Sequence, residues 1–174
     1  MNQTEVEYGV TDRYSLGLYG VFIEGQGFSA VKVENRYRLN EPGEWPVDTA
    51  LYLEFKKGIQ DKAQDEIEGK VILSKDWGPV NISANPILEL EKEEKPGGDE
   101  WELEAGLALG TCYTRFWKRV TPGIELFLAE KESRVTPGFY IDLAPDVRLN
   151  LGAGIGIEKA ADPFQLKTIL ELEF

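Results

Sequence analysis

The stretch Val147-Arg148-Leu149-Asn150-Leu151-Gly152-Ala153-Gly154-Ile155-Gly156-Ile157 decides the fold class of this chain. Its odd-numbered residues are all apolar, and its even-numbered residues are arginine, asparagine and glycine. Successive side chains of a β-strand point to opposite faces, so this segment predicts a strand with one apolar and one polar face. The same alternation recurs in 101–110, 31–39 and 51–56, whereas helical spacing is almost absent. The sequence therefore predicts an all-β protein.

Turn residues divide the 174 residues into eleven predicted strands within one domain, 1–174. Tight turns at 11–13, 76–78 and 144–146 alternate with longer polar links at 25–27, 59–65, 94–99, 131–135 and 159–163. The segment 40–47 is an exception, because it is long where a short turn is expected. This alternation is typical of an antiparallel up-and-down β-barrel. The predicted strands are 4–10, 14–24, 28–40, 49–58, 66–76, 79–93, 100–115, 121–131, 136–143, 147–159 and 164–174.

An eleven-strand count is unexpected for such a barrel, because outer-membrane barrels of this kind have an even number of strands. Ten to twelve strands are compatible with the pattern if one segment has been wrongly split or merged. We favour twelve for the complete barrel, with a first strand that lies outside this chain. The last strand, 164–174, would then be separated from 4–10 by that missing strand.

Composition excludes several other classes of protein. No apolar run approaches the roughly 20 residues of a membrane-spanning helix. A net charge of −12 argues against nucleic acid as a partner, since phosphate binding needs clustered lysine and arginine. No leader peptide is visible at Met1, so an exported protein would have lost it. Cys112 is the only cysteine, which is compatible with export and allows no internal disulfide.

Alternation alone leaves open which face lies inside the barrel. A soluble, ligand-carrying barrel is apolar within, whereas a membrane barrel is apolar outside and polar within. Three features favour the transmembrane arrangement: glycines mixed with charges on the polar face, strands near the 9–11 residues needed to cross a bilayer, and aromatic residues near strand ends. Those aromatic residues are Tyr8, Tyr14, Phe22, Phe28, Phe55, Trp77, Trp101, Phe116, Trp117, Phe139 and Phe164.

Two further resemblances concern the outer membrane. The segment Leu166–Phe174 alternates and ends in an aromatic residue, and so looks like the signal by which outer-membrane proteins are recognised by their assembly machinery. The stretches Glu7–Gly17 and Val120–Leu126 resemble poorly characterised outer-membrane barrels described as similar to a phenol-degradation meta-pathway protein. That resemblance implies a transport role and supplies no catalytic positions. The missing opening strand departs from it.

No enzymatic chemistry is predicted, and no cofactor or metal. The chain has no histidine, on which the enzymatic outer-membrane barrels rely as base or orienting group. The segment Gly152–Gly156 lacks the spacing and the following helix of a dinucleotide loop. Carboxylate pairs such as Glu102/Glu104, Glu89/Glu91 and Glu171/Glu173 are what any polar strand face offers. A weak cation site in the acidic links, at Asp61 and Asp65 or at Glu93, Glu94 and Asp99, stays open.

If the polar face is the lumen, meaning the interior of the barrel, its acids outnumber its bases by about six. This surplus predicts a narrow, weakly cation-preferring channel or passive transporter for small solutes or ions in the outer membrane of a Gram-negative-type bacterium. Two alternatives stay open: a structural or interaction barrel with a plugged lumen and function in outer loops such as 59–65, and a soluble ligand-carrying barrel. The predicted lumen-lining residues are Lys32, Glu34, Arg36, Arg38, Glu54, Lys56, Glu68, Lys70, Glu102, Glu104, Glu125, Asp142, Arg148, Lys167 and Glu171.

Overall fold

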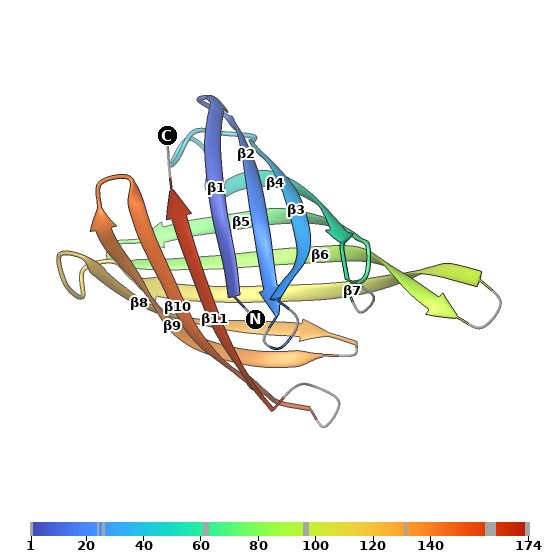
Figure 1. The fold of residues 1–174 in the computed structure, drawn as a ribbon. Coiled ribbons are helices and arrows are strands. Elements are labelled where there is room, and N and C mark those ends of the chain that lie inside the picture. Colours follow the sequence, from blue (N-terminus) through green and yellow to red (C-terminus); the bar gives the residue numbers. More distant parts are fainter. Residues whose placement is uncertain are drawn as a thin grey trace.

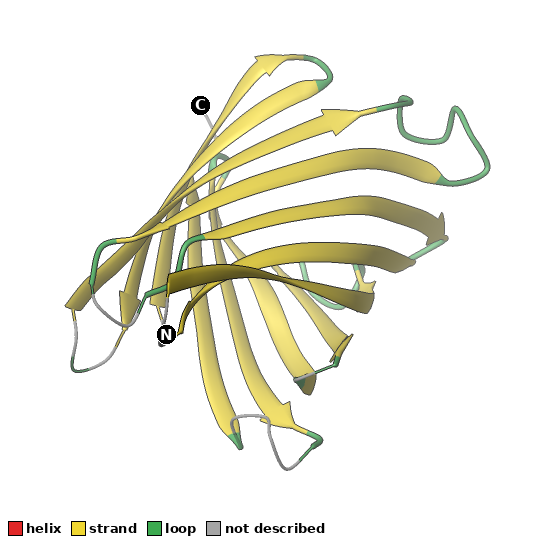
Figure 2. Cartoon of the chain, turned by 90° about the vertical axis from the view of Figure 1, so that its right-hand side faces the viewer, coloured by secondary structure: helices red, strands yellow, loops and turns green. Residues whose placement is uncertain are grey.

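The chain forms a closed β-barrel in a computed structural model that describes residues 2–23, 25, 27–60, 63–95, 98–130, 132–158 and 163–172. Figure 2 shows only strands and connecting loops among these residues. None of the described segments is a helix long and apolar enough to cross a membrane. The all-β prediction is thus confirmed for the described part of the chain.

Eleven strands follow one another around the barrel, each hydrogen-bonded to its neighbours in sequence (Figure 1). The predicted and observed strands agree one for one. The longest two, β6 and β7, extend past the others at one end of the barrel (Figure 1). The strands are β1 (Asn2–Thr11), β2 (Tyr14–Ile23), β3 (Gly27–Arg38), β4 (Asp48–Gly58), β5 (Glu66–Trp77), β6 (Val80–Lys95), β7 (Gly98–Tyr113), β8 (Val120–Ala129), β9 (Ser133–Ala144), β10 (Val147–Gly156) and β11 (Phe164–Leu172).

The barrel closes through a short parallel pairing of β1 with β11. Gln3 lies opposite Ile169 and Thr4 opposite Leu170, whereas every other strand pair is antiparallel. An odd number of sequential strands places the first and last in the same direction, so one parallel contact is unavoidable. The prediction of an entirely antiparallel barrel is therefore wrong at this one contact. The favoured count of twelve is also not what this chain forms, because its eleven strands close without a further one.

Two predicted links are largely strand in the structure. The ladder of β6 and β7 continues to the pair Lys95 and Gly98, inside the predicted link 94–99. Likewise β9 begins at Ser133, inside the predicted link 131–135. The long turn 40–47 is held by side chains: the Asn40 carbonyl Oδ1 accepts a hydrogen bond from the Thr49 backbone N–H at 2.8 Å, and Asp48 Oδ1 accepts one from Gly43 N–H at 2.7 Å.

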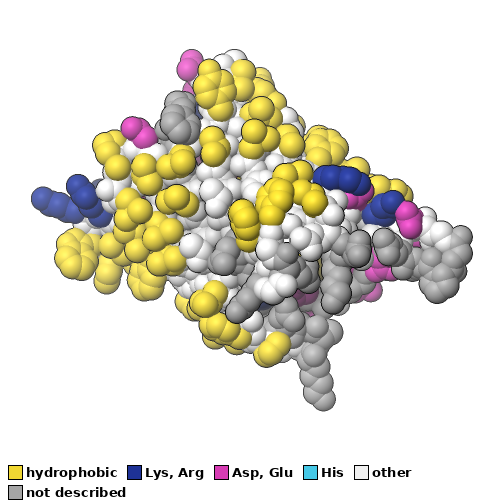
Figure 3. Space-filling model, in the orientation of Figure 1, with side chains coloured by type: hydrophobic (Ala, Val, Ile, Leu, Met, Phe, Trp, Pro, Cys, Tyr) yellow, Lys and Arg dark blue, Asp and Glu magenta, His cyan; other side chains and the backbone are white. Residues whose placement is uncertain are grey.

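Polarity is inverted relative to a water-soluble barrel. The buried residues of the described chain include Glu5, Glu34, Glu54 and Glu66, while large apolar side chains are exposed on every strand. Figure 3 shows apolar side chains spread over the barrel wall, with charged ones gathered toward its edges. Ten of the eleven predicted end-of-strand aromatics are exposed on the surface. The remaining one, Tyr14, is half-buried and donates a hydrogen bond to Asn35 Oδ1 at 2.7 Å.

Candidate functional site

The barrel encloses a cavity of about 590 Å³, lined by residues from ten of its strands. Within the described chain the lining contains seven acids and five bases, a surplus of two negative charges. This surplus is smaller than the six expected from the sequence, because several predicted residues lie elsewhere. Nine predicted lumen residues do line the cavity: Lys32, Glu34, Arg36, Glu54, Glu68, Lys70, Glu125, Lys167 and Glu171.

The other predicted lumen residues lie outside this cavity lining. Arg38 contacts the carbonyl oxygen of Asp12 at the barrel end that carries the short turns. Asp142 and Arg148 pair there at 2.8 Å, about half exposed, beside a smaller cavity of about 60 Å³ that Glu171 also lines. Lys56 pairs with Glu66 next to the large cavity. Glu102 and Glu104 lie on the extended part of β7.

A row of glutamates crosses five neighbouring strands, a feature that only the register reveals. Each glutamate lies directly opposite the next one across the ladder. Like charges placed directly opposite one another are destabilising unless counter-charges lie close by. This glutamate row consists of Glu34, Glu54, Glu68, Glu89 and Glu104.

Bases placed two residues away along the same strands, and so on the same face, neutralise much of the row. Lys32 pairs with Glu54 at 2.7 Å, and both side chains are largely buried. Arg36 pairs with Glu34 at 2.6 Å, and Lys70 with Glu68 at 2.9 Å. Because burial of a charge is costly unless it is paired, these contacts make the acidic row compatible with a folded interior.

Two tyrosines complete this network, and sequence reasoning did not select them. Tyr52 donates its hydroxyl hydrogen to Glu54 Oε2 at 2.7 Å, and the Lys70 ammonium lies 3.6 Å from the centre of the Tyr52 ring. Tyr19 donates to Glu34 Oε2. Tyr52 shares its strand face with Glu54 and Lys56, so its place in the alternation was the signal available in the sequence.

Arg134 is a further cavity residue that the sequence prediction missed. It lines the cavity and pairs with Glu132, yet it falls inside the predicted link 131–135. Its side chain crosses Gly154 of β10, where an added Cβ would overlap the arginine stem. The alternation of Arg134, Val135 and Thr136 was a signal that the strand begins earlier than its turn residues suggest.

The wall opposite the glutamate row contains one glycine on each of four neighbouring strands, and we call it the glycine wall. Gly110, Gly123, Gly138 and Gly152 of β7–β10 line a second cavity of about 120 Å³. This cavity shares the lining residues Glu125, Thr136 and Lys167 with the large one, so the two cavities are adjacent. Glycine leaves space that any side chain would fill, and these four positions therefore leave a smaller cavity open beside the large charged one.

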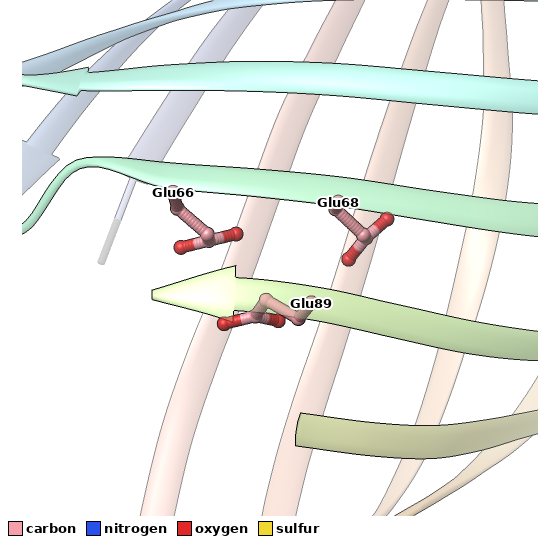
Figure 4. Close-up of side chains that lie close together, drawn as sticks. All are labelled: Glu66, Glu68 and Glu89. Atoms are coloured by element: carbon pink, nitrogen blue, oxygen red, sulfur yellow. The ribbon is translucent and has the colours of Figure 1, made fainter. Parts of the chain in front are cut away.

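Three carboxylates come close enough to hold a cation. Oxygens of Glu66, Glu68 and Glu89 lie within 4.8 Å of one another, with the side chains directed between β5 and β6 (Figure 4). Hard cations such as Ca²⁺ prefer clustered carboxylate oxygens. Here Lys56 and Lys70 already pair with Glu66 and Glu68, so a bound metal would compete with two ammonium groups. The sequence prediction did not foresee this cross-strand trio, which depends on register.

The link 59–65 is anchored at its second end by Asp65. Its carboxylate accepts hydrogen bonds from Lys57 Nζ at 2.6 Å and from the Gly58 backbone N–H at 3.0 Å. The hydrogen bond from Lys57 holds the pKa of Asp65 below its usual value. The Asp65 carboxylate is therefore already hydrogen-bonded by groups of the protein itself. Asp61, the other acid of the predicted loop site, lies outside the described residues.

No known protein-family model matches this chain, and no curated protein sequence matches it.

Proposed function

We propose that this chain is an outer-membrane β-barrel that acts as a narrow, weakly cation-preferring channel or passive transporter. One observation carries the proposal: large apolar side chains cover the outside, while Glu5, Glu34, Glu54 and Glu66 are buried inside. In water, such an arrangement would leave a large apolar surface exposed to solvent, which is unfavourable. In a bilayer it buries that surface, and closure satisfies the backbone groups that lipid cannot.

Strand length and aromatic placement support a membrane location. The strands have 9 to 16 residues, and a tilted strand needs about 9–11 to cross the hydrocarbon core. The exposed Trp77 ends β5, and the exposed Trp117 lies in the link between β7 and β8; such positions are where aromatic belts meet lipid headgroups. The lipid bilayer is thus the first partner that we propose. Assembly through the C-terminal Phe174 stays a prediction, since this residue lies outside those that the structure describes.

The soluble carrier is the weaker alternative. It requires an apolar interior that can receive a lipid-like ligand. The cavity lining is instead dominated by ionised and hydrogen-bonding side chains, with Ile72, Phe127 and Ile169 as its larger apolar members. A ligand for this interior would be polar or charged.

Cation preference follows from the charge of the cavity. Two excess acids in its lining make the potential at its centre negative, which favours cations over anions. The preference is weak because most acids are paired with bases. Permeation would use both cavities, since the one of about 120 Å³ at the glycine wall is adjacent to the larger one.

The same ion pairs favour a second function, a structural barrel whose lumen is plugged. Lys32, Arg36 and Lys70 reach from the wall to the glutamate row and occupy part of the lumen. In that case function would lie in the outer loops, such as 59–65. The proposed channel and the plugged barrel differ only in whether a continuous water path exists.

Two experiments test the proposal in order. We expect the purified chain to fold only with detergent or lipid and to migrate differently on a gel before and after boiling. A folded monomer in plain buffer would rule out both membrane functions. In planar bilayers, we expect small conductance steps with weak cation selectivity. A heat-modifiable, folded sample without conductance would refute the channel and favour the plugged barrel.

A further inference from the structure

The hairpin of β6 and β7 carries an uncovered sheet edge. The pairing of β7 with β8 begins at Gly106 opposite Ala129, so no described strand lies beside Gly98–Ala105 on that side. On its other side this segment pairs with β6 throughout. Eight residues of strand correspond to an edge about 26 Å long. Proteins normally cover or shorten such edges, because they accept a further strand.

The chemistry of this hairpin is strongly acidic. The segment Leu88–Ala105 contains eight acids and two lysines, a net charge of −6 in a chain whose total is −12. Three glutamates of β6 lie directly opposite three of β7 across the ladder, all on the face that continues the barrel interior. These opposed pairs are Glu89 with Glu104, Glu91 with Glu102, and Glu93 with Glu100.

The other face of the hairpin is apolar and exposed nearer the barrel, and toward the tip it carries the ion pair of Lys92 with Asp99. Leu88, Trp101 and Leu103 have half or more of their surface accessible, at 57%, 50% and 62%. A strand added beside β7 would extend both faces of the sheet, because its side chains alternate in the same way. Its neighbours on one face would be glutamates, and on the other Trp101 and Leu103.

We propose that the edge Gly98–Ala105 is a docking site for an extended, basic segment of another protein, added to β7 as a further strand. Main-chain hydrogen bonds along the edge provide the affinity, and side chains on alternate positions provide the specificity. The partner therefore alternates lysine or arginine with apolar residues. A second copy of this chain fits poorly, because edge-to-edge pairing would bring two glutamate faces together.

The test uses the full chain in a neutral detergent and a labelled nine-residue peptide that alternates lysine with valine. We expect saturable binding by fluorescence anisotropy, weakened by salt, and slower amide hydrogen exchange confined to Gly98–Ala105. Two peptides of unchanged charge serve as controls: one with backbone N-methyl groups on its central residues, and one with its lysines grouped at one end. Each is expected to bind about tenfold more weakly, since the first cannot donate edge hydrogen bonds and the second cannot match the alternation.

Protein variants provide a second arm. The double substitution Glu102→Lys and Glu104→Lys is expected to weaken binding of the alternating peptide at least about tenfold. The exposed Asp12→Asn, in the short turn between β1 and β2, should leave binding unchanged. Equal binding of the N-methylated peptide would reduce the effect to general electrostatic attraction and overturn the proposal. Peptide-induced protection of amides outside Gly98–Ala105 would also overturn the proposal. So would self-association of the chain that protects this edge when no peptide is present.

Discussion

Glu125 offers the sharpest test of cation preference. It lines both the large cavity and the glycine-walled one, and no ion pair among the described residues includes it. A cavity of about 590 Å³ has, as a sphere, a radius of about 5 Å, at which one charge contributes about 0.8 kcal/mol in water. Replacing Glu125 by glutamine removes that attraction for a cation near the centre. It also removes an equal repulsion for an anion, so the difference between the two ions changes by about 1.6 kcal/mol, and we expect the ratio of cation to anion permeability to fall about fifteenfold.

Lys167 is the matched counterpart, since it lines the same two cavities with the opposite charge. Lys167→Gln should raise the permeability ratio by a similar factor, whereas the exposed Glu130→Gln should leave it unchanged. The assay is the reversal potential of single channels across a KCl gradient in planar bilayers. Shifts of the same sign for Glu125→Gln and Lys167→Gln would refute the electrostatic reasoning. So would an unchanged ratio in both variants while conductance persists.

Three further predictions concern the interior and the link 59–65. Gly152→Met places a side chain against Thr136 in the glycine-walled cavity and should lower conductance by about half. Gly69→Met should not lower the conductance, because an added Cβ at Gly69 meets nothing within 4 Å. Lys32→Met leaves Glu54 buried without its lysine and should cost about 3 kcal/mol of stability in urea unfolding. Adding Glu54→Gln to Lys32→Met should recover most of this loss of stability. The control Lys57→Met, at an exposed lysine, should cost less than about 1 kcal/mol. Equal costs for the two lysine substitutions would contradict the reasoning. Gly58→Ala would overlap the Ala63 carbonyl oxygen and should open the link to limited proteolysis, whereas Gly69→Ala should leave cleavage unchanged.

Strand positions were predictable because the period of two is a local property of the chain. Val147–Ile157 predicts its strand from eleven residues, and the observed β10 differs only at its end. The errors fall where composition and alternation disagree. Lys95 and Gly98 flank Pro96 and Gly97 in the sequence and look like loop residues, yet the ladder holds them in register. Arg134 was placed in a link for the same reason, although Val135 and Thr136 continue its alternation.

The candidate site was predictable residue by residue but not as an arrangement. Alternation assigns Glu34, Glu54 and Glu68 to one face of their strands, and all three line the cavity. That these glutamates stand directly opposite one another depends on the register of separate strands. Register follows from turn lengths and from closure of the whole barrel, which no single segment encodes.

The sequence by itself determined the all-β class, the approximate position of each strand and the division of side chains into two faces. These follow from alternation, since each strand fixes its own faces wherever it lies. Only the tertiary structure decided which face is interior, how β1 meets β11, and which charges become partners. Those outcomes depend on contacts between residues far apart in the chain, such as Lys32 with Glu54, and closure of the barrel brings them together.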